Sequence, residues 1–175
     1  MIHETEKPSL TNTAGQMAMP IGLMWAASFL CSIYGMEYYV LSPMSYVFAI
    51  ASVFVLRRQL AAYSRLYCPI GRRHLWWLAL TSCLLAGLLT DAIQYIYFAF
   101  LDQGRLQSGL STAMESEEYR EAWSQLMPEV PLEMMQEMMA SITIRDIMQH
   151  IVSFNIMLAL PLSLTAWTIS KSTRD

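Results

Sequence analysis

A single acidic residue, Asp91, stands within the longest apolar stretch of this sequence, residues 75–101. On a helix it shares a face with Gly87 and Gln94, a small residue and an amide. Small and polar residues together are typical of a contact between membrane helices rather than of a lipid-facing surface. A carboxylate at the centre of a bilayer costs about 2.5–3.5 kcal/mol on insertion scales, so we expect it to have a partner on another helix.

Asn155 is the matching polar residue of the last apolar stretch, residues 147–169, where it shares a helical face with Ala159 and Ser163. It lies about as far from the outer end of its stretch as Asp91 does from the outer end of its own. We therefore predict that the two side chains meet in the outer half of a helical bundle. The predicted polar cluster has three central members, followed by two nearer its outer mouth: Asp91, Gln94, Asn155, His150 and Glu37.

This cluster supports two interpretations. In the first it is a proton or ligand site that opens outward, since an ionisable group inside a membrane is often functional. In the second it is a hydrogen bond between helices that fixes their packing. We favour the second, because one acid near a helix contact is a weak signal for chemistry. A water-accessible cavity beside Asp91 would favour the first interpretation, and burial against Asn155 without a cavity would favour the second.

A methionine pattern, Met-Met-x-x-Met-Met, stands in the acidic loop at residues 134–139. Thioethers are soft ligands that suit Cu(I), and residues at i, i+4 lie on one helical face. Methionine is also an adaptable packing residue on a helix that docks against lipid or a partner. We favour packing, because copper-handling segments interleave more histidine and His150 is the only one nearby. The methionines of the pattern and its flanks are Met134, Met135, Met138 and Met139, with Met114, Met127 and Met148.

The sequence carries no enzyme signature. There is no His-Glu-x-x-His zinc motif, no Gly-x-Ser-x-Gly nucleophile motif and no glycine-rich phosphate loop. The three histidines are dispersed, and the three cysteines form no Cys-x-x-Cys pair. We therefore expect no catalytic reaction, no metal and no cofactor. Charged residues make up only 14% of the chain, which also excludes nucleic-acid binding and disorder.

Apolar stretches of about 20 residues are long enough to cross a bilayer as helices. The chain has 175 residues, 55% of them apolar, and holds four such stretches, which leaves little for a soluble domain. The second is the weakest, because Pro43 interrupts it early. The first lacks the flanks and cleavage site of a signal peptide, so we expect an uncleaved anchor. We predict an all-α, four-helix transmembrane bundle in one membrane domain, residues 18–171, with spans at about 18–36, 38–56, 75–101 and 147–169.

Basic residues indicate the orientation, since they gather on the cytoplasmic side of membrane proteins. Eight of the eleven lie in the three segments that four spans place on one side, whereas the loop at 102–146 on the other side holds nine acids. We therefore predict that the leader (1–17, expected to be flexible) and the tail (172–175) are both cytoplasmic. Membrane lipid is an expected partner. The basic loop either binds anionic lipid or, as we favour, only sets the topology; its arginines are Arg57, Arg58, Arg65, Arg72 and Arg73.

The outer loop predicts two short amphipathic helices. Ser116 followed by two glutamates is a helix start, and residues 117–126 place aromatic and apolar side chains on one face. Two prolines end this helix and permit a second at about 132–140. Thr143 and Asp146 have the spacing of a capping box at the start of the fourth span. Helices this short are unstable alone in water, so we expect them to lie against the bundle, lipid headgroups or a partner.

Small residues at i, i+4 spacing in the first span predict close helix packing. They are Gly22 with Ala26, and Ala27 with Cys31 and Gly35. The packing partner is either another span of the bundle, which we favour, or a second copy of the chain in a homo-oligomer.

Four spans, the arginine-rich loop, the acidic methionine-containing segment and the stretch QYIYFAFLDQG at 94–104 together resemble domain-of-unknown-function family 4199. Members of that family are small bacterial inner-membrane proteins, and no biochemical activity is attached to the family. The resemblance covers most of the chain beyond the leader, and it implies a bacterial inner membrane. We predict a structural or interaction component of that membrane. The alternative is a small transporter or sensor that uses the cluster around Asp91.

Overall fold

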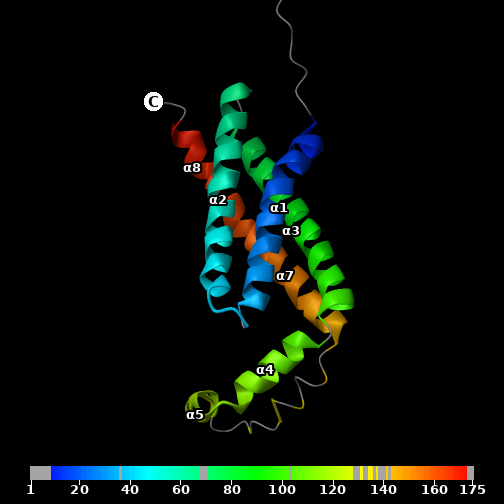
Figure 1. Ribbon diagram of the computed structural model, residues 1–175. Coiled ribbons are helices and arrows are strands. Elements are labelled where there is room, and N and C mark those ends of the chain that lie inside the picture. Colours follow the sequence, from blue (N-terminus) through cyan, green and yellow to red (C-terminus); the bar gives the residue numbers. More distant parts are fainter. Residues whose placement is uncertain are drawn as a thin grey trace, which may run out of the picture. The chain divides into compact units, whose positions relative to one another are not determined.

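The computed structural model is all-helical over the residues that it describes, which are 9–35, 37–67, 71–102, 104–127, 131, 134–135, 137, 141 and 143–172. The chain divides into two compact units, unit 1 with residues 1–94 and 151–175 and unit 2 with residues 95–150. Figure 1 shows the described elements, which are α1 (Leu10–Tyr34), α2 (Leu41–Leu66), α3 (Arg72–Ile96), the π-helix η1 (Tyr97–Leu101), α4 (Arg105–Glu115), α5 (Glu117–Leu126), α7 (Ile144–Ser163) and α8 (Thr165–Ser172).

Four stretches of helix are long and apolar enough to cross a membrane. The third joins α3 to η1, and the fourth joins α7 to α8 across a turn that follows Pro161. The predicted all-α architecture with four apolar helices is therefore confirmed. The four stretches are Leu10–Tyr34, Leu41–Leu66, Arg72–Leu101 and Ile144–Ile169.

The helix starts differ from the predicted span boundaries. The Ser9 side chain accepts a hydrogen bond from the Asn12 N–H at 3.3 Å, so α1 begins at Leu10 and residues 10–17, expected as flexible leader, are helical. Residues 1–8 lie outside the described residues. Pro43 does not interrupt the second span, because α2 begins at Leu41 and places the proline in its first turn. There its missing N–H costs no helical hydrogen bond.

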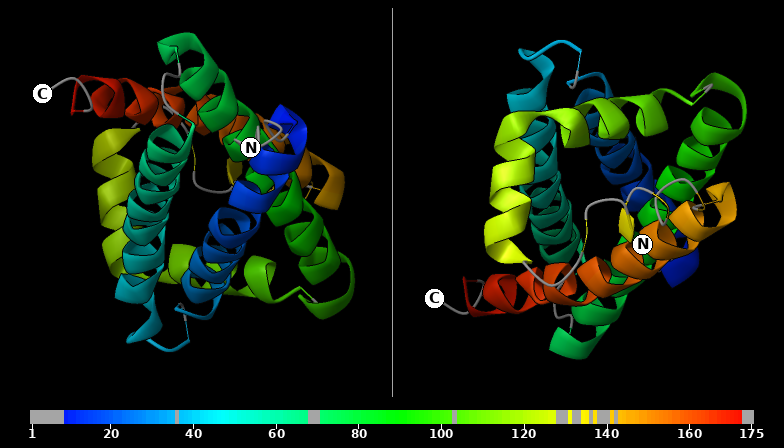
Figure 2. Two further views of the ribbon diagram at one scale, coloured as in Figure 1. Left: turned by 90° about the horizontal axis from the view of Figure 1, so that it is seen from above. Right: turned by 90° about the horizontal axis from the view of Figure 1, so that it is seen from below.

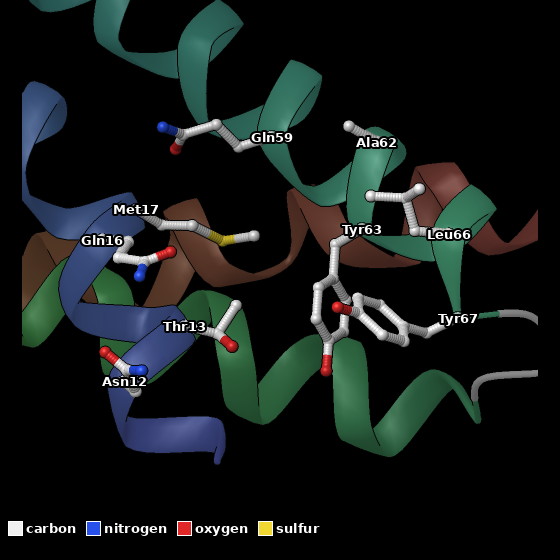
Figure 3. Close-up of a pocket in the computed structure, with 9 residues that line it drawn as sticks. All are labelled: Asn12, Thr13, Gln16, Met17, Gln59, Ala62, Tyr63, Leu66 and Tyr67. Carbon is white, nitrogen blue, oxygen red and sulfur yellow. The ribbon is translucent and has the colours of Figure 1, made fainter. Parts of the chain in front are cut away.

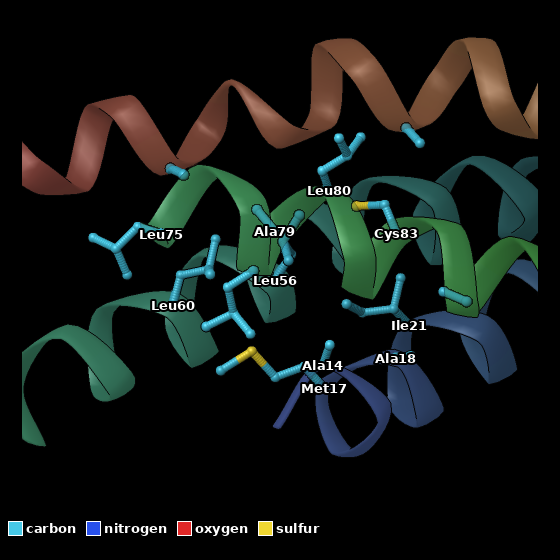
Figure 4. Close-up of a cluster of buried hydrophobic side chains, with 14 of the residues drawn as sticks. Ala14, Met17, Ala18, Ile21, Leu56, Leu60, Leu75, Ala79, Leu80 and Cys83 are labelled. Atoms are coloured by element: carbon cyan, nitrogen blue, oxygen red, sulfur yellow. The ribbon is translucent and has the colours of Figure 1, made fainter. Parts of the chain in front are cut away.

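The hydrophobic core of unit 1 lies where α1, α2 and α3 meet (Figure 4). Its largest fully buried apolar side chains are Ile21 of α1, Leu56 and Leu60 of α2, and Leu75 and Leu78 of α3. α7 and α8 run past this core and add three buried side chains, Ala159, Ala166 and Ile169, while Leu158 and Leu162 of α7 are partly buried against it. Three helices therefore build the core, and the fourth span packs on it through a narrow strip.

The outward faces of these helices are apolar and the inward faces carry hydroxyl groups. Phe54, Leu88 and Met157 are 65%, 62% and 71% exposed, whereas Ser52 and Ser82 are 2% and 0% exposed. A soluble protein rarely exposes contiguous apolar surface of this kind, because it would associate in water. The distribution suits helices whose outer surface faces lipid.

The two ends of unit 1 differ in charge. Figure 1 shows the start of α1, the end of α2, the start of α3 and α8 at one end, and the turn between α1 and α2 at the other. α1 and α2 run side by side in all views, and α8 packs against α2 (Figure 2). The second helix continues to Leu66, so the five arginines of the predicted basic loop lie on helices rather than in a loop. Arg57, Arg58 and Arg65 belong to α2, and Arg72 and Arg73 belong to α3. They gather toward the first end, while Glu37 lies in the turn at the other.

Unit 2 contains two consecutive helices between which the chain changes direction at Ser116 (Figure 2). The Ser116 side chain accepts the Tyr119 N–H at 3.3 Å, and α5 follows as expected from that helix start. The helix α4 before it was not predicted. The second predicted loop helix, at 132–140, falls largely outside the described residues, so the predicted pair of loop helices stays a prediction.

A reciprocal capping box opens α7, as the sequence pattern predicts. The N–H and the hydroxyl of Thr143 donate to Asp146 Oδ2 at 3.0 and 2.6 Å, and the Asp146 N–H lies 3.3 Å from Thr143 Oγ1, to which it donates. Donor groups of the first turn, which no helical carbonyl can reach, are thereby satisfied.

Thr143→Ala is expected to destabilise the first turn of α7 by about 0.5–2 kcal/mol, the usual cost of removing a helix cap. The measurement is amide hydrogen exchange of the purified chain in detergent, which should speed up at Arg145 and Asp146. Thr112→Ala is the control, because the Thr112 hydroxyl donates only to the Ser108 carbonyl within α4. Unchanged exchange at the start of α7 would contradict the capping role.

Candidate functional site

Asp91 of α3 and Asn155 of α7 form the central contact of the predicted cluster. The Asn155 Nδ2 atom donates a hydrogen bond to Asp91 Oδ1 at 2.6 Å. Asp91 is 8% exposed, so its carboxylate is largely withdrawn from the surface of unit 1. The two side chains therefore meet as their depth in the sequence predicts, and the bond joins two separate spans.

Small residues bring α3 and α7 close enough for this bond. A Cβ atom on Gly87, one helical turn before Asp91, would lie 3.5 Å from Asn155 Cβ, so the asparagine packs over the glycine. Ala159 and Ser163 follow Asn155 on the same face of α7, and both are fully buried. An interface of small side chains around one polar pair is a common way for membrane helices to associate. The hydrophobic effect does not drive helices together in lipid, so close packing and hydrogen bonds between helices take its place.

A tryptophan extends the polar contacts to the other two spans. Trp25 of α1 donates its indole N–H to Ser52 Oγ of α2 at 2.9 Å, and both side chains are buried. The Trp25 ring lies 4.0 Å from the position of a Cβ on Gly87. Gly87 is therefore placed between Trp25 and Asn155, and all four spans take part in one connected contact region.

Trp25 and Ser52 were not among the predicted site residues, although the position of Trp25 in the sequence indicates a polar contact. Membrane tryptophans are enriched at the two interfaces, and Trp25 stands in the middle of its span. A buried indole N–H needs an acceptor, so a central tryptophan indicates a polar partner on a neighbouring helix.

α1 and α3 are also in close contact beside the same region. A Cβ on Gly22 would lie 2.9 Å from the carbonyl oxygen of Ala86. The Thr90 hydroxyl lies 3.1 Å from the Gly22 carbonyl oxygen and 2.9 Å from that of Ala86, and it donates to this pair of carbonyls. The predicted small-residue contact at Gly22 therefore lies within unit 1, against α3.

The other predicted members take different positions. Gln94 is buried on the same face of α3, and its Oε1 atom has no hydrogen-bond partner in the part of the chain that the structure describes. Glu37 is exposed in the turn between α1 and α2. His150 belongs to unit 2, where its Nδ1 lies 2.8 Å from the Asp146 carbonyl oxygen. The placement of Glu37 and His150 at the mouth of the cluster stays a prediction.

A second polar feature is a pocket of about 330 Å³ between the start of α1 and the end of α2 (Figure 3). Two of its lining atoms, Thr13 Oγ1 and Gln59 Oε1, are buried without a hydrogen-bond partner among the described residues. Tyr63 and Tyr67 line the same pocket, with ring centroids 4.8 Å apart. The described residues that line it offer neutral hydrogen-bonding groups and no charged side chain, and they include neither Asp91 nor Asn155.

Metal binding finds no further support in the described ranges. No group of three or more histidine, cysteine or acidic side chains there is arranged to hold a metal ion. Of the methionine pattern, Met138 and Met139 lie outside the described residues, so the alternative of Cu(I) binding stays untested.

Four helices that are long and apolar enough to cross a membrane indicate that the chain belongs to the class of multi-pass helical membrane proteins. No protein-family model, no curated protein and no solved structure matches the sequence or the fold. The resemblance to family 4199 therefore stays an expectation.

Proposed function

We propose that the protein is a structural or interaction component of the bacterial inner membrane, without a catalytic reaction of its own. The observation that carries the proposal is the 2.6 Å hydrogen bond that Asn155 Nδ2 donates to Oδ1 of the Asp91 carboxylate. The pair is packed over Gly87, and the pocket between the start of α1 and the end of α2 is not lined by Asp91 or Asn155. A carboxylate used in this way holds two helices together.

In this proposal the chain crosses the membrane four times with both termini in the cytoplasm. The excess of basic residues at one end of unit 1 supports this orientation, because such residues are retained on the cytoplasmic side. The nine acids of the loop at 102–146 then face the outside. The resemblance to family 4199 supports the bacterial inner membrane as the location.

The two predicted amphipathic helices of the outer loop are the proposed contact with a protein partner. α5 places Tyr119 and Trp123 on one face, with ring centroids 6.2 Å apart, and Leu126 on the same face is 80% exposed. Aromatic and large apolar side chains of this kind are enriched at the centres of protein interfaces.

Photo-crosslinking in native membranes tests the proposed contact. A photoreactive residue at Leu126 is expected to give one defined crosslinked product with a membrane protein or a second copy of the chain. The same residue at Glu121, on the opposite face of α5, is the control and should give none. No product at either position, or the same products at both, would contradict an interaction surface on α5.

The second candidate is a small transporter or sensor, and one observation favours it. The Gln94 Oε1 atom is buried without a partner among the described residues, three positions after Asp91. Unsatisfied polar atoms inside a bundle are characteristic of a ligand or water path. This candidate requires a side chain at position 91 that can take up and release a proton, whereas the structural role requires only a hydrogen-bond acceptor there.

A further inference from the structure

Three arginines line a pocket of about 450 Å³ between α2 and α8, here called the arginine pocket. α8 lies beside the second half of α2, at the end of unit 1 where α2 ends and α3 begins (Figure 1). The pocket is thus at the end of the bundle that the proposed orientation places in the cytoplasmic leaflet. Its lining residues are Phe54, Arg57, Arg58, Ala61, Arg65, Thr168 and Ile169.

The spacing of the arginines along α2 explains why they share one pocket. Arg58, Ala61 and Arg65 follow Phe54 at i+4, i+7 and i+11, which places them on a single face of the helix. Arg57 flanks this stripe. Arg58 and Arg65 are two turns apart, roughly 10 Å along the axis, and the small Ala61 between them leaves the space open.

Among the described residues, no acidic side chain balances the positive charge of this pocket. Within the part of the chain that the structure describes, no acidic side chain pairs with Arg57, Arg58 or Arg65. α8, with the sequence TAWTISKS, contains no acidic residue that could face them. Like charges on neighbouring turns repel each other, so an anion bound between them is stabilised.

The side of the pocket toward the middle of the membrane is apolar. Phe54 lines the pocket and is 65% exposed, and Val47 and Ile50 continue its face along α2 with 53% and 59% exposure. Along one helix face the surface therefore changes from apolar to cationic at Arg57. A ligand that fits both parts has an anionic head joined to an apolar chain.

We propose that the arginine pocket binds the phosphate group of an anionic phospholipid, with the acyl chains lying along the apolar face of α2. The planar guanidinium group binds phosphate oxygens through two parallel N–H donors, and Thr168 of α8 lines the same space. Basic pockets between membrane helices on the cytoplasmic side are known to hold such headgroups. The inference rests on the membrane placement in the proposed function, and it assigns these residues a role beyond setting the topology.

Native mass spectrometry of the purified full-length chain in detergent tests the inference. The probes are dioleoyl phosphatidylglycerol, dioleoyl phosphatidylcholine and inorganic phosphate, each titrated separately. Phosphatidylglycerol is expected to bind at least tenfold more tightly than phosphatidylcholine, and inorganic phosphate is not expected to compete with it at equal concentration. Arg65→Gln should weaken phosphatidylglycerol binding about fivefold, the factor that corresponds to about 1 kcal/mol per basic residue near the membrane surface.

Two further variants distinguish a loss of binding at the pocket from an effect of net charge and from misfolding. Arg73→Gln removes the same charge from an exposed position at the same end of unit 1 outside the pocket, and it should change the affinity less than twofold. Thr168→Trp keeps every charge and fills the pocket from α8, and it should weaken binding as Arg65→Gln does.

Equal losses in Arg65→Gln and Arg73→Gln would overturn the pocket in favour of a general charge effect. Competition by inorganic phosphate at equal concentration would overturn a lipid as the source of the phosphate. Both results would leave the proposed function standing, because that proposal is tested at Leu126 and Asp91. A chain that fails to enter lipid vesicles at all would instead contradict the membrane placement itself.

Discussion

Gly22→Ala is expected to lower the free energy of unfolding by about 1–3 kcal/mol, the usual cost of overpacking a core. The added Cβ would lie 2.9 Å from the carbonyl oxygen of Ala86 and 3.3 Å from its Cα, and these backbone atoms of α3 cannot move aside alone. α1 and α3 therefore have to separate, which lengthens the 3.1 Å bond from Thr90 Oγ1 to the Gly22 carbonyl. The measurement is denaturant unfolding of the purified chain in detergent.

Gly15→Ala is the matched control for this prediction. It is the same substitution in the same helix, and no atom lies within 4 Å of its added Cβ. Alanine has the higher helix propensity, so the control should leave the stability unchanged or raise it by up to about 1 kcal/mol. Similar losses in the two variants would show that α1 and α3 are not in close contact at Gly22.

Asn155→Ala is expected to cost about 1.5–3 kcal/mol, the range for a hydrogen bond to a charged group. The substitution removes the Nδ2 donor that lies 2.6 Å from Asp91 Oδ1 and leaves a buried carboxylate without this partner. A double-mutant cycle with Asp91→Ala measures the pair directly, and we expect a coupling of about 1 kcal/mol or more. Additive effects of the two substitutions would contradict the hydrogen bond between the helices.

Asp91→Asn separates the two candidate functions. The amide oxygen it introduces can accept from Asn155 Nδ2 as the carboxylate does, so the structural role predicts that the bond is kept and that the stability changes by no more than about 1 kcal/mol, the difference between a charged and a neutral acceptor. A proton pathway would be lost in the same variant, since an amide does not titrate. Proton flux into liposomes that is lost in Asp91→Asn would therefore contradict the structural role and support the transporter.

The contact between Asp91 and Asn155 could be predicted from the sequence because two independent constraints agreed. Each residue has small neighbours one helical turn away, Gly87 for the acid and Ala159 for the amide, and the two stand at similar depth. Insertion energetics then require a partner for a carboxylate inside a span. A lone polar residue in a membrane helix has few possible partners, so the similar depth and the small neighbours together predict the pairing.

Other contacts could not be predicted, for physical reasons that differ from case to case. The face of α1 that carries Trp25 meets Ser52 of α2, and hydropathy does not fix rotation when both faces are apolar. Residues 10–17 are polar in part, so hydropathy places the start of the first span at Ala18. The helix in fact starts eight residues earlier, at Leu10 after the Ser9 cap. α4 was missed because its sequence, RLQSGLSTAME, mixes helix formers with glycine and serine.

The narrow strip by which α7 packs has a consequence for how the chain is made. Only Ala159 and Ser163 of α7 are buried, whereas the core residues of unit 1 come mostly from α1, α2 and α3. These three helices precede α7 in the chain and leave the ribosome first, so we expect them to bring most of the core together before α7 joins it. In that order α7 would dock on a surface that is already formed, with Asp91 in place to accept from Asn155.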